Sequence, residues 1–170
     1  MELNDIIALL IAFGALLISG LTMMFQRRHN ALTVRPLITE HVQITPTLQY
    51  TFTGIEISNK GLGPAEIASV KIRYRKDDKE IVSHSWKSIL EDAGLWQTWV
   101  SYIDFGRGDV LETGETKSLI TISENDLKPE RKNKMIALMH HMIIIINYKS
   151  LYGNTFTYTF MGKKIRRPEQ

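Results

Sequence analysis

The sequence predicts a mainly β protein: an immunoglobulin-like antiparallel β-sandwich with one short helix, preceded by a single transmembrane α-helix. Three observations lead to this fold class. A long uncharged apolar run lies near the amino terminus. The chain after it alternates apolar and polar residues in roughly seven short segments separated by turn residues. These segments show no strand–helix–strand rhythm, which favours an antiparallel arrangement.

The apolar run extends from Ile6 to Phe25 and contains no charged residue. At about 1.5 Å of rise per residue, a helix of this length spans roughly 30 Å, the thickness of the hydrocarbon core of a bilayer. A secretory signal would carry basic residues before a shorter apolar core, whereas here the preceding residues are acidic and Met23 to Arg27 makes a poor cleavage site. We therefore expect a permanent anchor.

The charges beside this anchor predict its orientation. No Lys or Arg precedes it, while Arg27, Arg28 and Arg35 follow it. Because Lys and Arg close to a membrane span stay in the cytoplasm, we expect the amino terminus outside and the β domain in the cytoplasm. A periplasmic β domain is the alternative.

One face of the expected membrane helix carries small side chains. They recur at heptad-like spacing, and they are Ala8, Ala12, Ala15, Ser19 and Thr22. Small residues allow close approach of two helices in lipid, so the stripe indicates self-association or a membrane partner. The other interpretation is that such residues are common in any membrane helix.

The chain divides into three parts. Residues 1–30 form the anchor with its short amino-terminal tail, residues 31–162 the β-sandwich domain, and residues 163–170 a basic carboxy-terminal tail. The tail bases Lys163, Lys164, Arg166 and Arg167 are expected at the membrane surface together with Arg27 and Arg28, or else they only solubilise the chain.

In the first half of the domain, the sequence predicts two strands, a turn and a third strand. Pro36 ends the long helix, and Leu37 to Pro46 holds an edge strand. In Thr47 to Ser58 the apolar alternation changes phase at Gly54, which indicates a β-bulge. The segment from Asn59 to Pro64 is a turn with two glycines that are free to take positive φ. Ala68 to Arg75 is a half-buried strand whose basic outer face is either solvated, as we expect, or anion-facing.

The second half predicts the short helix and the remaining strands. Ser85 is a plausible N-cap and Gly94 a stop for a helix between them. Strands are expected at 95–105, 117–122 and 156–160, Met135 to Met142 is helix or strand, and Ile143 to Tyr148 is a central strand covered on both faces. Whether Trp86, Trp96 and Trp99 are core or surface stays open.

Two segments together carry a resemblance to a known group. They are Arg28-His29-Asn30-Ala31-Leu32-Thr33-Val34-Arg35-Pro36 and Ile57-Ser58-Asn59-Lys60-Gly61-Leu62-Gly63-Pro64-Ala65. The chain resembles small uncharacterised bacterial single-pass membrane proteins with a β-rich domain bearing an Asn-x-Gly-x-Gly-Pro-Ala turn. The resemblance implies a bacterial inner-membrane source and transfers no catalytic residue.

No motif in the sequence predicts catalysis or a cofactor. His140 and His141 are adjacent, so on a strand they would point to opposite faces and could not share a metal ion. The Gly61–Gly63 and Gly106–Gly108 segments match no phosphate-binding pattern and are expected to be turns. The chain has no cysteine, which excludes disulfides and thiolate sites.

These observations predict a non-enzymatic, membrane-tethered interaction module without metal or cofactor, presenting its β-sandwich at the inner-membrane surface. Its expected partners are the lipid bilayer and a protein, which is either a different chain or a second copy bound through the membrane helix; nucleic acid is not expected. The alternatives are an oligomerising membrane sensor or effector in stress or phage defence, a periplasm-facing binding module, and an enzyme whose site is assembled from distant residues.

Overall fold

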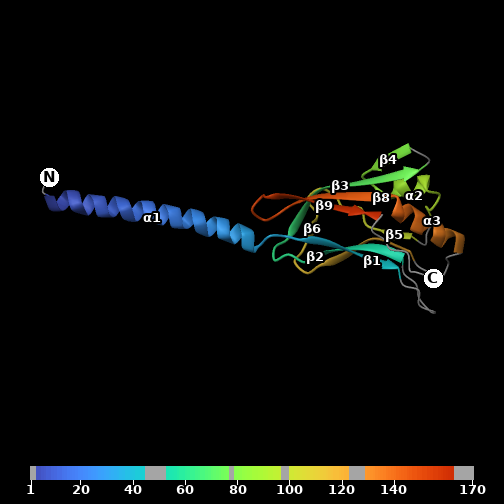
Figure 1. Ribbon diagram of the computed structural model, residues 1–170, viewed down its shortest axis with the longest axis horizontal. Helices are drawn as coiled ribbons and strands as arrows, with labels where there is room; N and C mark the ends of the chain where they lie inside the picture. Colours follow the sequence, from blue (N-terminus) through green and yellow to red (C-terminus); the bar gives the residue numbers. More distant parts are fainter. Residues whose placement is uncertain (1–2, 45–52, 77–78, 97–99, 123–128, 163–170) are drawn as a thin grey trace.

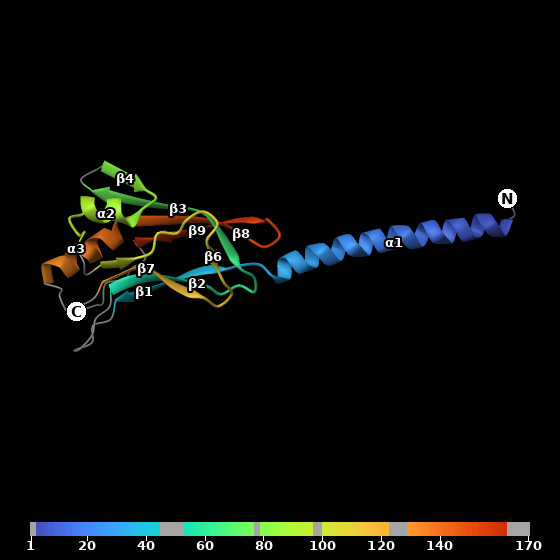
Figure 2. The same ribbon diagram turned by 180° about the vertical axis from the view of Figure 1, so that it is seen from behind.

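The computed structural model describes residues 3–44, 53–76, 79–96, 100–122 and 129–162. A long helix, α1 (Leu3–Thr33), projects from a β-rich domain, and its amino terminus lies far from that domain (Figure 1). None of its residues is buried. Within the described residues it is the one helix long and apolar enough to cross a membrane, judged by length and composition. The view from behind shows the same separation of helix and domain (Figure 2).

The helix ends where the sequence predicts. Just after the helix, the N–H of Val34 still donates a hydrogen bond to the carbonyl of Asn30, 3.1 Å away, and Pro36 follows two residues later. Proline disfavours helical geometry in the residue before it, which explains the stop. Strand β1 (Ile38–Ile44) then begins, and it is an edge strand, as expected.

The described residues of the domain form nine strands in two antiparallel sheets. The first sheet has the order β1-β2-β7-β5, with β2 (Thr53–Asn59), β7 (Thr116–Ile122) and β5 (Val100–Tyr102). The second has the order β4-β3-β8-β9, with β4 (Lys79–Ser83), β3 (Ala65–Lys76), β8 (Met142–Lys149) and β9 (Thr155–Met161). A two-residue strand, β6 (Val110–Leu111), also pairs with β3. The prediction of a mainly β domain behind one long apolar helix is confirmed.

The two sheets share one apolar core. Ile55 and Ile57 of β2 face Ile72 of β3 and Ile144 and Ile146 of β8 in a single cluster, and all five are fully buried. Each buried aliphatic side chain of this size contributes about 1.5–3 kcal/mol relative to exposure, so this cluster is what drives the two sheets together.

The predicted bulge exists, but its extra residue is on another strand. The pairing of β2 with β7 shifts between Ile55 and Glu56, which leaves Leu119 of β7 as the extra residue. As a result Leu119 and Ile120 are both buried although they are consecutive. The part of the expected phase change before Gly54 lies outside the described residues.

The described residues of the domain include two helices, so the prediction of one short helix is wrong. The expected helix is α2 (Trp86–Asp92), whose N-cap Ser85 accepts a hydrogen bond from the N–H of Lys87. The additional helix is α3 (Pro129–His140). Among its residues with a described burial, Met135, Leu138 and Met139 are buried. Its apolar residues continue directly into β8, so periodicity alone did not separate helix from strand.

Strand β8 is central in its sheet, as predicted, but it is fully covered on one face only. Its alternate residues from Met142 to Tyr148 are buried, whereas Ile143 and Ile145 on the outer face are half-buried. Trp86 belongs to the core at 1% exposure, and Trp96 is 41% exposed. Trp99 lies outside the described residues. Of the strand predicted at 95–105, only β5 is found, and residues 95–96 and 103–105 are not in a strand.

One polar contact joins the two sheets across the edge of the core. The hydroxyl of Tyr158 in β9 donates a hydrogen bond to the carboxylate of Glu40 in β1. Burial raises the pKa of Tyr158 above its ordinary value, and the Glu40 carboxylate raises it further. The folded protein therefore keeps the phenol protonated at a pH where the unfolded chain would release the proton.

We predict that this contact makes stability fall at alkaline pH. Above a pH of about 10, the unfolded state binds fewer protons than the folded state, so the free energy of unfolding decreases as pH rises. Tyr158→Phe should lower stability at neutral pH by about 1–2 kcal/mol and flatten the alkaline decrease, measured by urea unfolding across the pH range. Tyr152→Phe, at an exposed turn, is the control and should keep the original slope.

Candidate functional site

Three segments distant in sequence meet where α1 joins the domain. They are the linker Val34 to Leu37, the β2–β3 turn from Asn59 to Gly63, and the segment from Leu111 to Glu115 that connects β6 with β7. We call this meeting point the junction. It lies at the end of the domain that faces α1 (Figure 1).

The side chain of Asn59 holds the three segments together. Its Oδ1 accepts hydrogen bonds from the N–H of Leu37 at 3.1 Å and of Gly61 at 3.0 Å. Its Nδ2 donates to the carbonyl of Gly63 at 2.8 Å and of Leu111 at 3.0 Å. The residue is 0% exposed, so all four bonds form in the absence of water. An amide has both donors and acceptors, and no carboxylate or hydroxyl could make this set.

Backbone hydrogen bonds reinforce the same meeting point. The N–H of Lys60 donates to the carbonyl of Leu37 at 2.8 Å, and that of Leu62 donates to Arg35 at 3.2 Å. On the other side, the N–H of Asn59 donates to the carbonyl of Glu115, and Asn59 accepts from Gly114. The linker is therefore bonded along its length to the domain.

The carboxylate of Glu115 closes the turn that supports Asn59. It accepts a hydrogen bond from the N–H of Glu112 at 2.8 Å, and Lys117 lies 3.2 Å away. These two contacts, the backbone bond first, hold the pKa of Glu115 below its ordinary value. The turn thus keeps its charge-assisted bond at neutral pH.

The glycines of the β2–β3 turn are needed for close approach. A Cβ on Gly61 would lie 2.3 Å from the carbonyl oxygen of Arg35, and one on Gly63 would lie 2.0 Å from that of Val34. Both neighbours are backbone atoms and cannot swing away. Neither glycine uses the positive φ that glycine allows, since neither has a φ in the left-handed region. Sequence reasoning recognised the turn but had no signal for the chain that packs on it.

The small-residue stripe lies on the exposed surface of α1. Ala8, Ala12, Ala15, Ser19 and Thr22 are all exposed. The hydroxyl of Thr22 donates to the carbonyl of Ile18 at 2.8 Å, so its proton is used within the helix. Association through this face stays a prediction.

The basic residues of the predicted membrane surface are placed in part. Arg27 and Arg28 are exposed on the last turns of α1. Lys163, Lys164, Arg166 and Arg167 lie outside the described residues. The chain enters that tail from Gly162, which packs against the carbonyl of Met139 in α3, at the end of the domain remote from α1.

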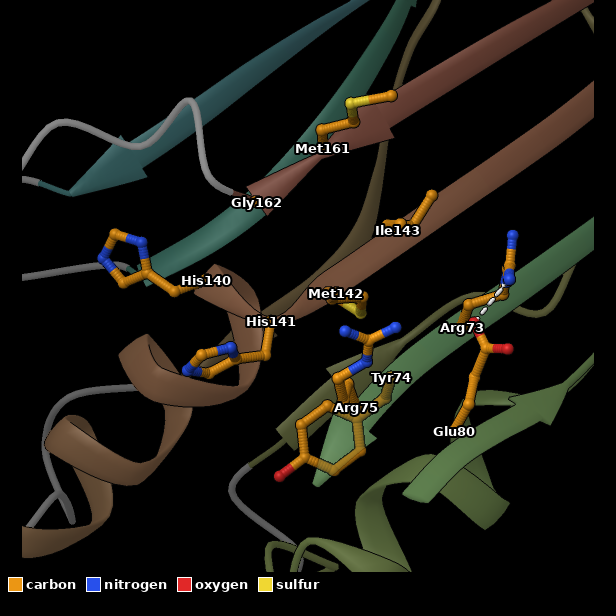
Figure 3. Close-up of a pocket in the computed structure, with 10 residues that line it drawn as sticks. All are labelled: Arg73, Tyr74, Arg75, Glu80, His140, His141, Met142, Ile143, Met161 and Gly162. Atoms are coloured by element: carbon orange, nitrogen blue, oxygen red, sulfur yellow. Dashed lines mark hydrogen bonds and ion pairs between the residues drawn. The ribbon is translucent and has the colours of Figure 1, made fainter. Parts of the chain in front are cut away.

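A cavity of about 460 Å³ lies at that remote end (Figure 3). Its lining comes from β3, β4, the end of α3, β8 and β9, and consists of Arg73, Tyr74, Arg75, Glu80, His140, His141, Met142, Ile143, Met161 and Gly162. Arg73 is paired with Glu80, with Nε and Oε1 2.8 Å apart. His140 ends α3 and His141 follows it. The two residues are therefore not on a strand, which was the geometry considered for them from the sequence.

Among the described residues, no three His, Asp or Glu side chains are grouped so that they could hold a metal ion. The buried Nε2 of His140 has no hydrogen-bond partner in this part of the chain. Arg75 and His141, which come from two different elements, line the cavity together with apolar side chains.

Comparison with known proteins adds little. No protein-family model and no curated protein matches the sequence. Among solved structures, the chain is similar to the archaeal flagellum of Methanospirillum hungatei strain JF1, with 9% identity over 94% of this chain and 88% of that chain. The TM-score is 0.34.

We predict that Asn59→Asp destabilises the domain by about 2–5 kcal/mol. The substitution keeps the shape but removes both donors, leaving the buried carbonyls of Gly63 and Leu111 without partners. Urea unfolding of the full chain in detergent measures the loss. Asn147→Asp is the matched control, because Asn147 also bridges two strands through Ser69 and Thr157 but is half-exposed. Equal losses in the two variants would contradict the role given to Asn59.

We predict that Gly63→Ala loosens the junction. The added Cβ pushes on the carbonyl of Val34, so the linker must move and α1 no longer holds one direction relative to the domain. The chain lacks cysteine, so spin labels at Leu32→Cys and Val82→Cys report this directly, and their distance distribution should broaden. Gly106→Ala is the control, since its Cβ would meet nothing closer than 3.7 Å; its distribution should stay narrow.

Proposed function

We propose that this chain is a non-enzymatic, membrane-tethered interaction module. In this proposal α1 is a permanent anchor in a bacterial inner membrane, and the domain is an immunoglobulin-like β-sandwich on the cytoplasmic side. The domain presents one sheet face to an acidic protein partner. The observation that carries the proposal is the combination of an apolar helix that buries nothing in its own chain with a bonded linker at its base.

An isolated apolar helix of this kind needs an apolar environment. Large side chains such as Leu10, Phe13 and Met23 are 59–75% exposed along α1. Exposing each of them to water costs on the order of 1.5–3 kcal/mol relative to burial, and a bilayer removes that cost along the whole run. Arg27 and Arg28 follow the run directly, which supports a cytoplasmic domain by the distribution of basic residues.

The partner surface in this proposal is the outer face of the sheet β4-β3-β8-β9. Strand register aligns Val82, Arg73, Ile143 and Met161 in one row across the four strands. Val82 is 46% and Met161 48% exposed, and Ile143 is half-buried. Ile145 adds a second apolar position beside Lys71. A central strand with isoleucines on its open face is unusual for a surface that only meets water.

Charge on this face favours an acidic partner. Arg73 is neutralised by Glu80, whereas Lys71 and Arg75 are exposed on the same side of β3. The cavity at the end of the sheet adds Arg75 and His141 around a space that could accept an acidic side chain (Figure 3). An apolar centre with a basic rim is the anatomy expected of a specific protein interface.

Self-association is the second candidate. The stripe from Ala8 to Thr22 is left uncovered on α1, which is what a membrane helix needs for a close contact with a second copy. In that case the chain would act as an oligomerising sensor or effector. The sheet face would then take part in signalling rather than bind a constant partner.

Site-specific crosslinking in intact cells tests the proposed interface. A photoreactive residue at Ile145 should yield one discrete crosslinked product, and one at His41, exposed on the opposite sheet, should not. Lys71→Glu with Arg75→Glu should reduce the yield about tenfold or more, because like charges then face each other. Arg107→Glu with Lys134→Glu reverses two exposed bases elsewhere and should leave it unchanged.

The opposite results would overturn this interface. Equal yields from Ile145 and His41, or no effect of the charge reversal at β3, would show that the sheet face is not the binding surface. Protease added to intact spheroplasts separates the two orientations, since a cytoplasmic domain is protected and a periplasmic one is digested.

A further inference from the structure

We infer that the tip of the β8–β9 hairpin is a second membrane contact, and that the groove between this tip and α1 binds the headgroup phosphate of an anionic phospholipid. The inference rests on the proposed membrane anchor and adds a lipid site that the anchor alone does not require.

The first step is the depth of the hairpin tip. A groove of about 260 Å³ separates α1 from the tip, and the described residues lining it are Met24, Arg27, Arg28, Ala31, Tyr152 and Asn154. Both ribbon views show the tip reaching back to the end of α1 (Figures 1 and 2). If the run ending at Phe25 fills the hydrocarbon core, residues 26–31 extend about 9 Å beyond it, which is the headgroup zone. The tip therefore lies at headgroup depth.

The second step is the chemistry of the tip. Leu151 is 73% exposed and Tyr152 is 42% exposed. Polar residues are the usual choice at the tip of a hairpin in water, whereas tyrosine is enriched at membrane–water interfaces. Leucine and tyrosine here suit a tip that enters the interface.

The third step is the rigidity of the tip. The N–H of Ser150 donates to the carbonyl of Asn154 at 2.9 Å, and that of Gly153 donates back to Ser150 at 2.8 Å. Gly153 takes a φ of +79°, which closes the turn. Leu151 and Tyr152 are thus presented on a closed loop that requires no ordering on contact with lipid.

The fourth step is the charge of the groove. Arg27 and Arg28 lie on its α1 side, and Tyr152 and Asn154 can donate hydrogen bonds from the other side. None of the described lining residues carries a negative charge. Guanidinium groups bind phosphate oxygens through paired N–H donors, so a phosphodiester at this depth meets donors from both walls. A lipid whose headgroup carries no ammonium group is attracted more strongly, because no positive charge in that headgroup offsets its phosphate.

The junction makes the two contacts act together. Asn59 bonds the linker to the domain at Leu37, so only the few residues between Thr33 and Leu37 separate α1 from the domain that carries the tip. Two membrane contacts on one rigid body set the tilt of the domain relative to the bilayer, and hence the direction of its open sheet face.

Depth-dependent fluorescence quenching tests this inference on the full chain. The protein has no cysteine, so Leu151→Cys and, as the control, Val82→Cys can each carry a single environment-sensitive dye. In vesicles of phosphatidylcholine with phosphatidylglycerol, the dye at Leu151 should shift to the blue and be quenched severalfold more than the dye at Val82 by a lipid with a shallow nitroxide. Arg27→Gln with Arg28→Gln should weaken that quenching, as should pure phosphatidylcholine.

Each result decides a stated point. Equal, weak quenching at Leu151 and Val82 overturns the second contact, and equal quenching in both kinds of vesicle overturns the preference for an anionic lipid. Carbonate extraction of the same vesicles tests the anchor separately. Retained protein with no quenching at Leu151 leaves the proposed function standing and rejects this inference, whereas extracted protein rejects both. Inorganic phosphate added to the protein in detergent should leave the dye unchanged; a response there would assign the groove to a soluble anion.

Discussion

The structure depends on the four hydrogen bonds of one buried amide. Asn59 joins the end of the helix linker, its own turn and the strand end at Leu111, three places that the chain order keeps far apart. A buried polar group that is fully satisfied specifies a unique arrangement, because every alternative leaves donors or acceptors unpaired. This explains why the β domain and α1 form one object. Without the amide, the linker would keep only its backbone bonds to the β2–β3 turn, from Lys60 to Leu37 and from Leu62 to Arg35.

The same constraint relates the two ends of the domain. The junction and the β8–β9 tip lie beside the end of α1, while α3 and the cavity lie at the opposite end, remote from the anchor (Figure 1). Strands β8 and β9 run between these ends, so their open face stands above the base of α1. A module that must meet a partner near a membrane gains from this layout. The proposed partner surface would then be held away from the lipid, and the linker is joined to the domain by hydrogen bonds rather than left as a free tether.

Local signals in the sequence predicted a large part of this fold. The apolar run, the stop before Pro36 and the helix capped by Ser85 all depend on neighbours within a few residues, and each is found. Helix α3 was left open between helix and strand over Met135 to Met142, because its apolar triplet merges with the next strand. The junction was not predictable for a different reason. The resemblance drew attention to the segments around Pro36 and Asn59 separately, but only the fold shows that Gly61 and Gly63 exist to let the first segment pack on the second.

The hairpin tip matters because a membrane helix alone does not fix the orientation of its domain. A single membrane helix leaves its domain free to rotate about the helix axis and to lean, even when the linker is rigid, because the helix itself tilts in the bilayer. One more contact away from that axis removes the freedom to lean. The tip is placed for such a contact, since Tyr152 lines the same groove as Arg28 but on a different element, and Leu151 beside it is exposed. The rigidity provided by Asn59 is what transmits their contact to the sheet face, so the amide and the tip form one orienting device.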